Sequence, residues 1–596
     1  MMKVTEKIEN LRKLMAEKNI DAYMIPSADY HNSEYVGEHF KEREFITGFT
    51  GSAGTAVITK DQAGLWTDGR YFIQAEKQLQ GSGVKLYKMG NVGVPTIEEF
   101  LYSSLLENET LGFDGRVVPV QEGKVLENIL SKKNIKINYS YDLINSIWED
   151  RPPLSEEAIF DLGLEYAGES VSSKLNRVRD KMRELGANAH IITTLDDIGW
   201  LLNIRGNDVK FFPLILSYAI VTLEKVYLYI DERKVNDSIK SKLTKNNVEL
   251  RPYNDVYEDV KKFNEKDSVL IDPDRINYAL YNNIPETVKL IEEESPTILM
   301  KAIKNDTEIK NIIKAHIKDG IANTKFIYWL KTNVGKIKIT ELSAMDKLEE
   351  LRKEQEGYLW QSFSPICGFK EHAAIVHYSP TPETDIEVKP NSLLLTDTGG
   401  NYYEGSTDIT RTTALGEISD EIKEDFTTVL QCNLRLGKAK FIYGCNGINV
   451  DILARQPLWE KNKNFNHGTG HGVGYLGNLH EPPTGIRTKY KKIDSHEFEE
   501  GMIITDEPGI YIEGSHGIRI ENELLVRKGE VNEYGEFMYF EPITYVPIDL
   551  DAVDVNILTE EDKQELNRYH KKVYEIISPY LNDEEREWLK KYTRQV

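Results

Sequence analysis

The segment SLLLTDTGGNYYEGSTDITRT, residues 392–412, carries two aspartates on either side of a turn rich in glycine and tyrosine. Asp397 follows an apolar run, and Asp408 comes eleven residues later. A β-hairpin centred near Tyr402 and Tyr403 would place the two carboxylates opposite each other, about 5 Å apart at Cβ. Like charges in that arrangement repel, so the segment predicts paired strands whose carboxylates face a bound cation.

A second polar segment, NHGTGHGVG at residues 466–474, sets His467 and His471 four residues apart. On a helix this spacing would put both imidazoles on one face, as in the H-E-x-x-H zinc proteases. Each glycine of the segment would cost about 1 kcal/mol in a helix interior, and no glutamate follows His467. We therefore expect extended or irregular backbone that passes close to another part of the molecule.

A third segment, GMIITDEPGIYIEGSHGIRIENELLV at residues 501–526, supplies Glu507 and Glu521. Alternation along a strand would put Arg519 and Glu521 on one face and the neighbouring isoleucines on the other. His471 would then be the single nitrogen donor among four carboxylates. Such an oxygen-rich set suits a pair of hard divalent ions such as Mn²⁺ better than one tetrahedral structural zinc.

Composition narrows the classes of partner. The 596 residues include 97 acidic and 74 basic side chains, a net charge of −23, which argues against binding nucleic acid or an anionic membrane. The charged amphipathic start lacks the apolar core of a signal peptide, and no apolar run is long enough to span a membrane. Cys367, Cys432 and Cys445 fit no C-x-x-C motif, so free thiols in a reducing compartment are expected. We expect a cytoplasmic protein.

An internal duplication organises the first half of the chain. Residues 7–25, KIENLRKLMAEKNIDAYMI, and residues 174–192, KLNRVRDKMRELGANAHII, share one pattern: an amphipathic helix, a turn at Asn19 or Gly186, and a buried strand. Short β-rich segments follow each copy. The duplication predicts two similar α/β domains in which helices cover a sheet.

Composition also marks the boundaries between domains. The prolines and charges of residues 147–158 interrupt both periodicities and read as a linker. A helical pattern opens after residue 302, with His316 on its apolar face as a packing residue. We predict domains over residues 1–152, 153–302 and 303–596.

Four motifs follow one another along the third domain: D-x₁₀-D after an apolar run, H-G-x-G-H-G, D-E-P-G and R-I-E-N. Together they resemble the pita-bread metallopeptidase fold shared by methionine aminopeptidase, prolidase, creatinase and aminopeptidase P. The duplicated domains ahead of them, with GFTGSAGTAVIT and LWTDGRYFIQAEKQ in the first, resemble the creatinase-like domains of the long, three-domain aminopeptidase P. The resemblance implies a mixed α/β (α+β) chain: two creatinase-like N-terminal α/β domains followed by a pita-bread catalytic domain.

The resemblance implies a dinuclear site with five ligands: Asp397, Asp408, His471, Glu507 and Glu521. Asp397 would bind one ion, His471 and Glu507 the other, and Asp408 and Glu521 would bridge. Mn²⁺ is the expected metal, with Co²⁺ and Zn²⁺ as alternatives. The glycines around His471 would let the backbone run close to the ions.

The resemblance also assigns residues around the substrate. His377, His467 and His480 would surround the bound peptide, and Arg70 of the first domain would reach it. Arg519 would support a ligand carboxylate from behind. The triplet Lys370, Glu371 and His372 departs from the usual family pattern, with His372 read as a surface or packing residue, and it leaves the preference for the first substrate residue open.

The implied reaction is hydrolysis of the Xaa-Pro bond after the first residue of a peptide, with a metal-activated water as nucleophile. Glu507 would act as general base, and His377 would donate to the developing oxyanion. Thr559 and Asp562 predict the cap of a helical C-terminal region, which in the family often contributes to a homodimer.

Three alternatives remain at this stage. Prolidase is the nearest enzyme, acting on Xaa-Pro dipeptides. Some pita-bread domains are non-catalytic scaffolds that bind peptides, but those lose metal ligands, and all five are present here. A creatinase-like amidinohydrolase lacks the carboxylate set.

Overall fold

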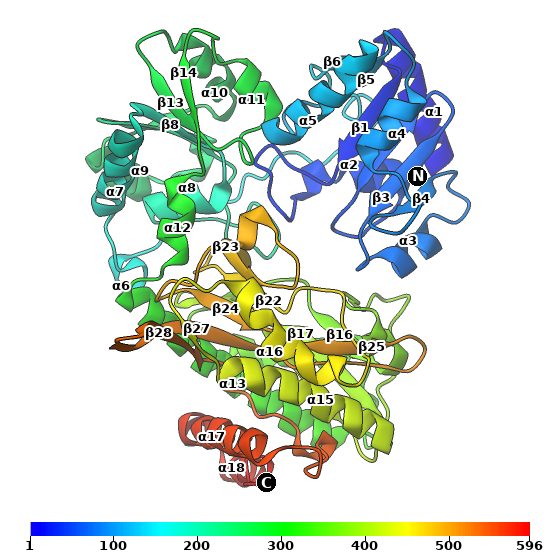
Figure 1. Cartoon of the computed structure of the whole chain (residues 1–596), viewed down its shortest axis with the longest axis vertical. Helices are drawn as coiled ribbons and strands as arrows, with labels where there is room; N and C mark the ends of the chain where they lie inside the picture. Colours follow the sequence, from blue (N-terminus) through cyan, green and yellow to red (C-terminus); the bar gives the residue numbers. More distant parts are fainter. Residues whose placement is uncertain (1) are drawn as a thin grey trace. The chain divides into compact units, whose positions relative to one another are not determined.

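A computed structural model describes residues 2–596 of the chain (Figure 1). Within those residues, contacts divide the chain into two compact units. The first unit runs up to Asp161 and includes Ser170–Thr297, and the second comprises Leu162–Glu169 and Ile298–Val596. The predicted boundary near residue 302 lies close to the start of the second unit's main segment. The limits 1–152, 153–302 and 303–596 stay predictions.

The first copy of the duplication forms helix α1 (Val4–Glu17), a left-handed residue at Asn19 with φ of 55°, and strand β1 (Ala22–Pro26). Ile8, Leu11 and Met15 recur at helical spacing, and they pack in one core with residues of the sheet. The sheet has the order β4-β3-β2-β1-β5-β6. Its other strands are β2 (Thr55–Thr59), β3 (Ala63–Thr67), β4 (Lys85–Lys88), β5 (Thr110–Gly112) and β6 (Lys136–Asn138).

The second copy repeats this plan. Helix α7 (Val171–Leu185) ends at Gly186, whose φ of 75° reverses the chain into β8 (Ala189–Ile192). The sheet has the order β12-β11-β10-β8-β13-β14, with strands β10 (Tyr218–Thr222), β11 (Val226–Tyr229), β12 (Val248–Arg251), β13 (Ser268–Ile271) and β14 (Lys289–Glu292). β1 and β8 hold the same topological place, because each pairs with one antiparallel and one parallel neighbour. The predicted duplication is confirmed.

The second unit contains the antiparallel sheet β21-β28-β27-β24-β22-β23, the smaller sheets β16-β17-β20 and β15-β18-β19, and the pair β25-β26. The first five strands are β15 (Tyr358–Gln361), β16 (Ile366–Phe369), β17 (Leu393–Thr398), β18 (Gly400–Tyr402) and β19 (Gly405–Ser406). They are followed by β20 (Ile409–Ala414), β21 (Lys440–Ile442), β22 (Gly470–Val473), β23 (His480–Ile486) and β24 (Ile503–Asp506). The last are β25 (Gly509–Ile512), β26 (His516–Arg519), β27 (Asn522–Asn532) and β28 (Gly535–Pro542).

Helices pack against these sheets: α13 (Asp306–Asn333), α14 (Glu341–Lys353), α15 (Asp420–Gly437) and α16 (Gly447–Trp459). α17 (Glu560–Ile577) and α18 (Asp583–Tyr592) form an outer layer against α13, and α17 also packs against α15 (Figure 1). α13, α15 and α17 share one apolar cluster with β26. This packing fixes the strands that carry the polar motifs to a helical layer.

Capping side chains set where the helices of the second unit begin. Asn305 accepts from Thr307 and Glu308 at the start of α13, and Thr559 accepts from Asp562 at the start of α17, as predicted for the C-terminal region. His316 is fully buried on α13, as predicted. Of the helices described in residues 2–596, none is long and apolar enough to cross a membrane.

The register of the aspartate hairpin differs from the prediction. Asp397 of β17 faces Thr410 of β20, rather than Asp408. The turn is centred at Tyr403 and Glu404, one residue later than expected, because Tyr402 pairs with Gly405. A shift of one residue in the centre moves the partner by two, so Asp397 and Asp408 are diagonal neighbours on one face.

Candidate metal centre

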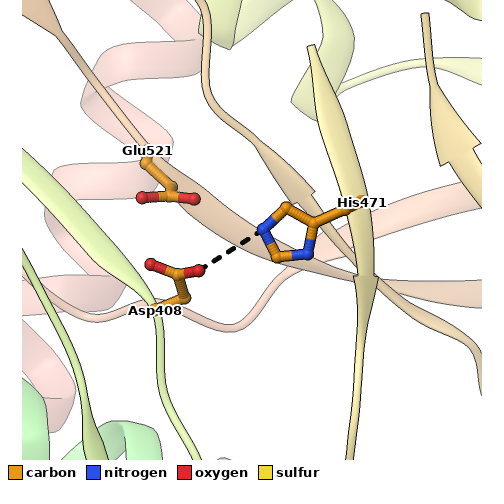
Figure 2. Close-up of side chains that lie close together, drawn as sticks. All are labelled: Asp408, His471 and Glu521. Atoms are coloured by element: carbon orange, nitrogen blue, oxygen red, sulfur yellow. Dashed lines mark ion pairs between the residues drawn. The ribbon is translucent and has the colours of Figure 1, made fainter. Parts of the chain in front are cut away.

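Figure 2 shows Asp408, His471 and Glu521 converging from three separate segments of the second unit. One ligand atom from each lies within 4.8 Å of the others. His471 Nε2 is 3.4 Å from Asp408 Oδ2 and 3.9 Å from Glu507 Oε1. The predicted nitrogen donor therefore faces carboxylate oxygens contributed by segments far apart in the sequence.

Neighbouring strands orient His471. It lies on β22, which pairs with β23 and β24. Its Nδ1 lies 2.9 Å from the Gly472 carbonyl oxygen, an acceptor that requires the ring proton on Nδ1. Nε2 then presents its lone pair to the carboxylates, which is the arrangement of a metal-binding histidine.

The glycines of this segment serve strand packing. A Cβ on Gly470 would lie 1.8 Å from the Thr505 carbonyl oxygen, and one on Gly472 would lie 2.2 Å from the Glu481 carbonyl oxygen. Any side chain at these two positions would collide with β24 or β23. Residues 470–473 of the segment are extended, and its backbone passes close to the neighbouring strands, as predicted. The predicted closeness of this backbone to the ions stays a prediction.

Asp397 enters the same region from β17. Arg519 donates from NH2 to Asp397 Oδ2 at 2.6 Å and from NH1 to the Tyr511 hydroxyl at 2.6 Å. Asp397 Oδ1 is buried, and no hydrogen-bond donor within residues 2–596 reaches it. A buried carboxylate oxygen without a donor fits the coordination of a cation.

The pKa shifts of the carboxylates also indicate a cation-binding site. Burial raises the pKa of Asp408 well above its ordinary range, and the nearby charges of Glu521 and Asp397 raise it further. Burial and the charges of Asp397 and Glu507 likewise raise the pKa of Glu521. Burial raises the pKa of Glu507 to about 7, with Asp397 adding to the shift and Arg519 opposing it. Crowded carboxylates of this kind ionise together when cations neutralise them, so the donor set fits divalent metal ions.

Two of the predicted substrate histidines contact residues of this centre, and the third follows a residue that contacts it. The His480 ring centroid is 4.1 Å from that of His471. His467 Nε2 lies 2.9 Å from the Tyr511 hydroxyl, which links it to Arg519. His377 follows Val376, whose carbonyl oxygen accepts from Arg519 NH2 at 3.4 Å.

Arg70 belongs to the first unit, where its guanidinium donates to both carboxylate oxygens of Asp68 at 2.9 and 2.8 Å. Its predicted contact with the peptide stays a prediction. The triplet that departs from the family pattern forms the 3-10 helix Lys370–Ala374. His372 Nδ1 lies 3.0 Å from the buried carboxylate of Glu341, so this histidine packs against the protein interior.

Sequence reasoning missed two residues that touch the centre. The Thr410 hydroxyl donates to Glu521 Oε2 at 2.7 Å, and Tyr511 joins His467 to Arg519. A signal for Thr410 existed, because it lies two residues after Asp408 and therefore on the same strand face. Nothing in the local pattern around Tyr511 distinguishes it from the chain's other tyrosines.

Comparison with known proteins extends along the whole chain. Residues 7–142 and 150–308 each match the Creatinase/Prolidase N-terminal domain, residues 310–528 match Metallopeptidase family M24, and residues 536–596 match the C-terminal region of peptidase M24. Aminopeptidase P2 of Arabidopsis thaliana is 39% identical across 99% of this chain and 88% of its own length. The chain belongs to the aminopeptidase P family.

The chain is also similar in sequence and in structure to other Xaa-Pro aminopeptidases. The probable Xaa-Pro aminopeptidase P of Laccaria bicolor is 37% identical over 98% of this chain and 93% of its own length. The crystal structure of X-prolyl aminopeptidase from Caenorhabditis elegans, a cytosolic enzyme with a di-nuclear active site, covers 100% of both chains with a TM-score of 0.95 and 33% identity. The predicted fold class and the resemblance to aminopeptidase P are confirmed.

Proposed function

We propose that this member of the aminopeptidase P family hydrolyses the bond between the first residue of a peptide and a proline at the second position. The observation that carries the proposal is the convergence of Asp408, His471 and Glu521 in a chain that matches Xaa-Pro aminopeptidases over its full length. All five predicted ligands are present, which favours an active enzyme over a non-catalytic scaffold.

The donor set suits two divalent ions, for which Mn²⁺ is our first choice and Co²⁺ or Zn²⁺ the alternatives. Asp408 and Glu521 would hold both ions, Asp397 one of them, and His471 with Glu507 the other. When bound, the ions would lower the pKa of a water molecule and polarise the scissile carbonyl. Arg519 would hold Asp397 through Oδ2 and so fix the direction of its other carboxylate oxygen.

The protein's own groups would move the proton. Glu507 would accept a proton from the water and return it to the departing proline nitrogen. His377 would donate to the carbonyl oxygen as negative charge develops on it. His467 and His480 would contact the peptide on either side of the bond. The proline nitrogen carries no N–H, so recognition depends on the ring rather than on a backbone donor.

We further propose a cytoplasmic homodimer that acts on peptides and binds neither nucleic acid nor membrane. Cys367, Cys432 and Cys445 are free thiols, which suits a reducing compartment. Arg70 is proposed to reach the peptide from the first unit.

Three peptides separate this proposal from its rivals. Metal-reconstituted protein is incubated with Arg-Pro-Pro, Gly-Pro and Met-Ala-Ser, and the released amino acids are measured. We expect release of arginine from Arg-Pro-Pro and none of methionine. Cleavage of Gly-Pro alone would indicate prolidase instead, and no turnover with Mn²⁺, Co²⁺ or Zn²⁺ would exclude an enzyme of this class. Chelator-treated protein is the control.

A further inference from the structure

A buried ion pair joins Asp451 and Arg455, one helical turn apart on α16. Arg455 Nε lies 2.7 Å from Asp451 Oδ2, and the arginine and aspartate side chains are 3% and 2% exposed. Burying two charges carries a desolvation cost that an exposed pair on the same helix would avoid. Contacts beyond α16 account for the pair's place in the interior.

Arg455 holds the segment that leads into His467. Its NH1 donates to the Phe465 carbonyl oxygen at 2.8 Å and to Asn464 Oδ1 at 3.0 Å, and its NH2 donates to the His467 carbonyl oxygen at 2.8 Å. The guanidinium also lies 3.9 Å from the centroid of the Phe465 ring, and that ring is 4.9 Å from the His467 imidazole. One guanidinium thus fixes both the backbone of His467 and the surface on which its ring packs.

Asp451 is connected through Thr469 to Glu507, one of the predicted metal ligands. Its second carboxylate oxygen accepts a hydrogen bond from the Thr469 hydroxyl. The Thr469 carbonyl oxygen accepts from the backbone N–H of Glu507 at 2.7 Å. Asp451 therefore holds Thr469, which lies between His467 and His471. Thr469 in turn holds the backbone of Glu507, the predicted general base, through its carbonyl oxygen.

We propose that the Asp451–Arg455 pair is a positioning device that sets His467 relative to His471 and Glu507. The proposal rests on the function proposed above. His471 is held independently by the pairing of β22 with β23 and β24, and the hydrogen bonds of Arg455 beyond Asp451 go to Asn464, Phe465 and His467. Loosening the contacts of Arg455 therefore displaces His467 and leaves metal binding intact. A misplacement of about 1 Å at a reacting centre costs on the order of 10²-fold in rate.

The test is Arg455→Lys in the full-length, metal-loaded protein. Lysine keeps the charge opposite Asp451 but lacks the planar fork that reaches Asn464, Phe465 and His467 together. We expect kcat on Arg-Pro-Pro to fall about 10- to 100-fold, with metal content at the wild-type level. Asp451→Asn is expected to lower kcat in the same direction, and Thr469→Val to lower it less.

Arg205→Lys is the matched control. Arg205 is 4% exposed and donates to the Gly199 and Ile204 carbonyl oxygens at 2.7 and 3.0 Å, in the first unit. Its replacement makes the same chemical change to a buried arginine and should leave kcat unchanged. A purely structural role for Arg455 would lower only the folded fraction, so active-site titration and melting curves are recorded for both variants.

Hydrogen–deuterium exchange gives a readout that does not depend on activity. Amides of residues 464–470 should exchange faster in Arg455→Lys than in the wild type, while those of β17 keep their rates. Normal kcat at full metal occupancy, or equal loss of kcat in both arginine variants, would overturn the proposal. If the wild-type protein cleaves no Xaa-Pro peptide, the proposed function fails, and unchanged exchange at residues 464–470 then overturns the positioning role on its own.

Discussion

Two carboxylate clusters in this molecule look alike by distance alone. The metal-site cluster is Asp408 and Glu521 with His471, and the first-unit cluster is Glu42, Asp114 and Asp142. In each, one ligand atom per residue lies within 4.8 Å of the others. Their surroundings differ in where the compensating positive charge comes from.

Arginines neutralise the first-unit cluster. Arg116 NH2 lies 2.7 Å from Asp114 and 3.3 Å from Asp142, and Arg151 lies 2.7 Å from Asp142 and 2.5 Å from Glu42. The Arg151 side chain is only 4% exposed. Guanidinium donors therefore occupy the positions around these oxygens that a cation would take.

The metal-site cluster has no such partner of its own. Arg519 pairs with Asp397, but no lysine or arginine within residues 2–596 forms an ion pair with Asp408 or Glu521. Crowded carboxylates therefore do not by themselves make a metal site. The deciding feature is whether the fold already supplies the counter-charge.

The largest effect is expected from removing a charge at the metal-site cluster. Asp408→Asn should lose bound metal and lower Xaa-Pro turnover by more than about 100-fold. Replacing a residue that only hydrogen-bonds to a metal ligand costs up to about 100-fold, and a ligand itself should cost more. Metal content by mass spectrometry and arginine release from Arg-Pro-Pro measure both. Glu42→Gln makes the matching carboxylate-to-amide change in the first-unit cluster and should keep metal and activity. Equal metal loss in both variants would refute the distinction.

Alanine substitutions of the two histidines of NHGTGHGVG should have different effects on metal content. His471→Ala is expected to lose metal, because Nε2 faces Asp408, whereas His467→Ala should keep metal and lose turnover by about 10²- to 10⁴-fold. Metal stoichiometry and kcat are measured on the same preparations. Comparable metal loss in His467→Ala would contradict this division of roles.

These expectations show what the sequence can and cannot provide. The site residues His471 and Glu507 could be predicted from the sequence, because residue type, glycine spacing and strand pattern are local features. The register of the hairpin is not local: it depends on a turn centred at Tyr403 and Glu404, and the glycine-rich segment could accommodate either centre. The sequence predicts that Arg519 supports a ligand carboxylate, but the identification of that carboxylate as Asp397, 122 residues away, comes from the folded chain.

The same reasoning explains why the first-unit cluster was invisible in the sequence. Arg151 lies in the segment read as a linker, and its partner Glu42 is 109 residues away. A proline-flanked arginine in a charged stretch resembles a solvated side chain. Burial of this residue arises from tertiary packing, which no local pattern records.

Arg151→Met should destabilise the fold without touching the metal. It leaves the buried Glu42 beside the half-buried Asp142 without the arginine that contacts both, and breaking a buried pair costs about 3–5 kcal/mol. Urea unfolding of the wild type and variant measures the difference. Arg183→Met, at an exposed pair with Asp180, should change the free energy of unfolding by at most about 1 kcal/mol. A similar small change in Arg151→Met would mean that the first-unit cluster does not need its arginines.

The smallest effect concerns pH. Burial, and then the charge of Asp142, raise the pKa of Glu42 from 4.5 to about 8 in the folded protein, against the opposing effect of Arg151. The folded state then holds a proton that the unfolded state has lost, so this group's contribution to stability is full below pH 4.5 and falls as pH rises to about 8. Glu42→Gln should flatten that decline, by at most about 1.4 kcal/mol per pH unit. Urea unfolding between pH 5 and 8.5 measures the slope of each protein, and parallel slopes would show that Glu42 is ionised in the fold and that Arg116 and Arg151 fully neutralise the first-unit cluster.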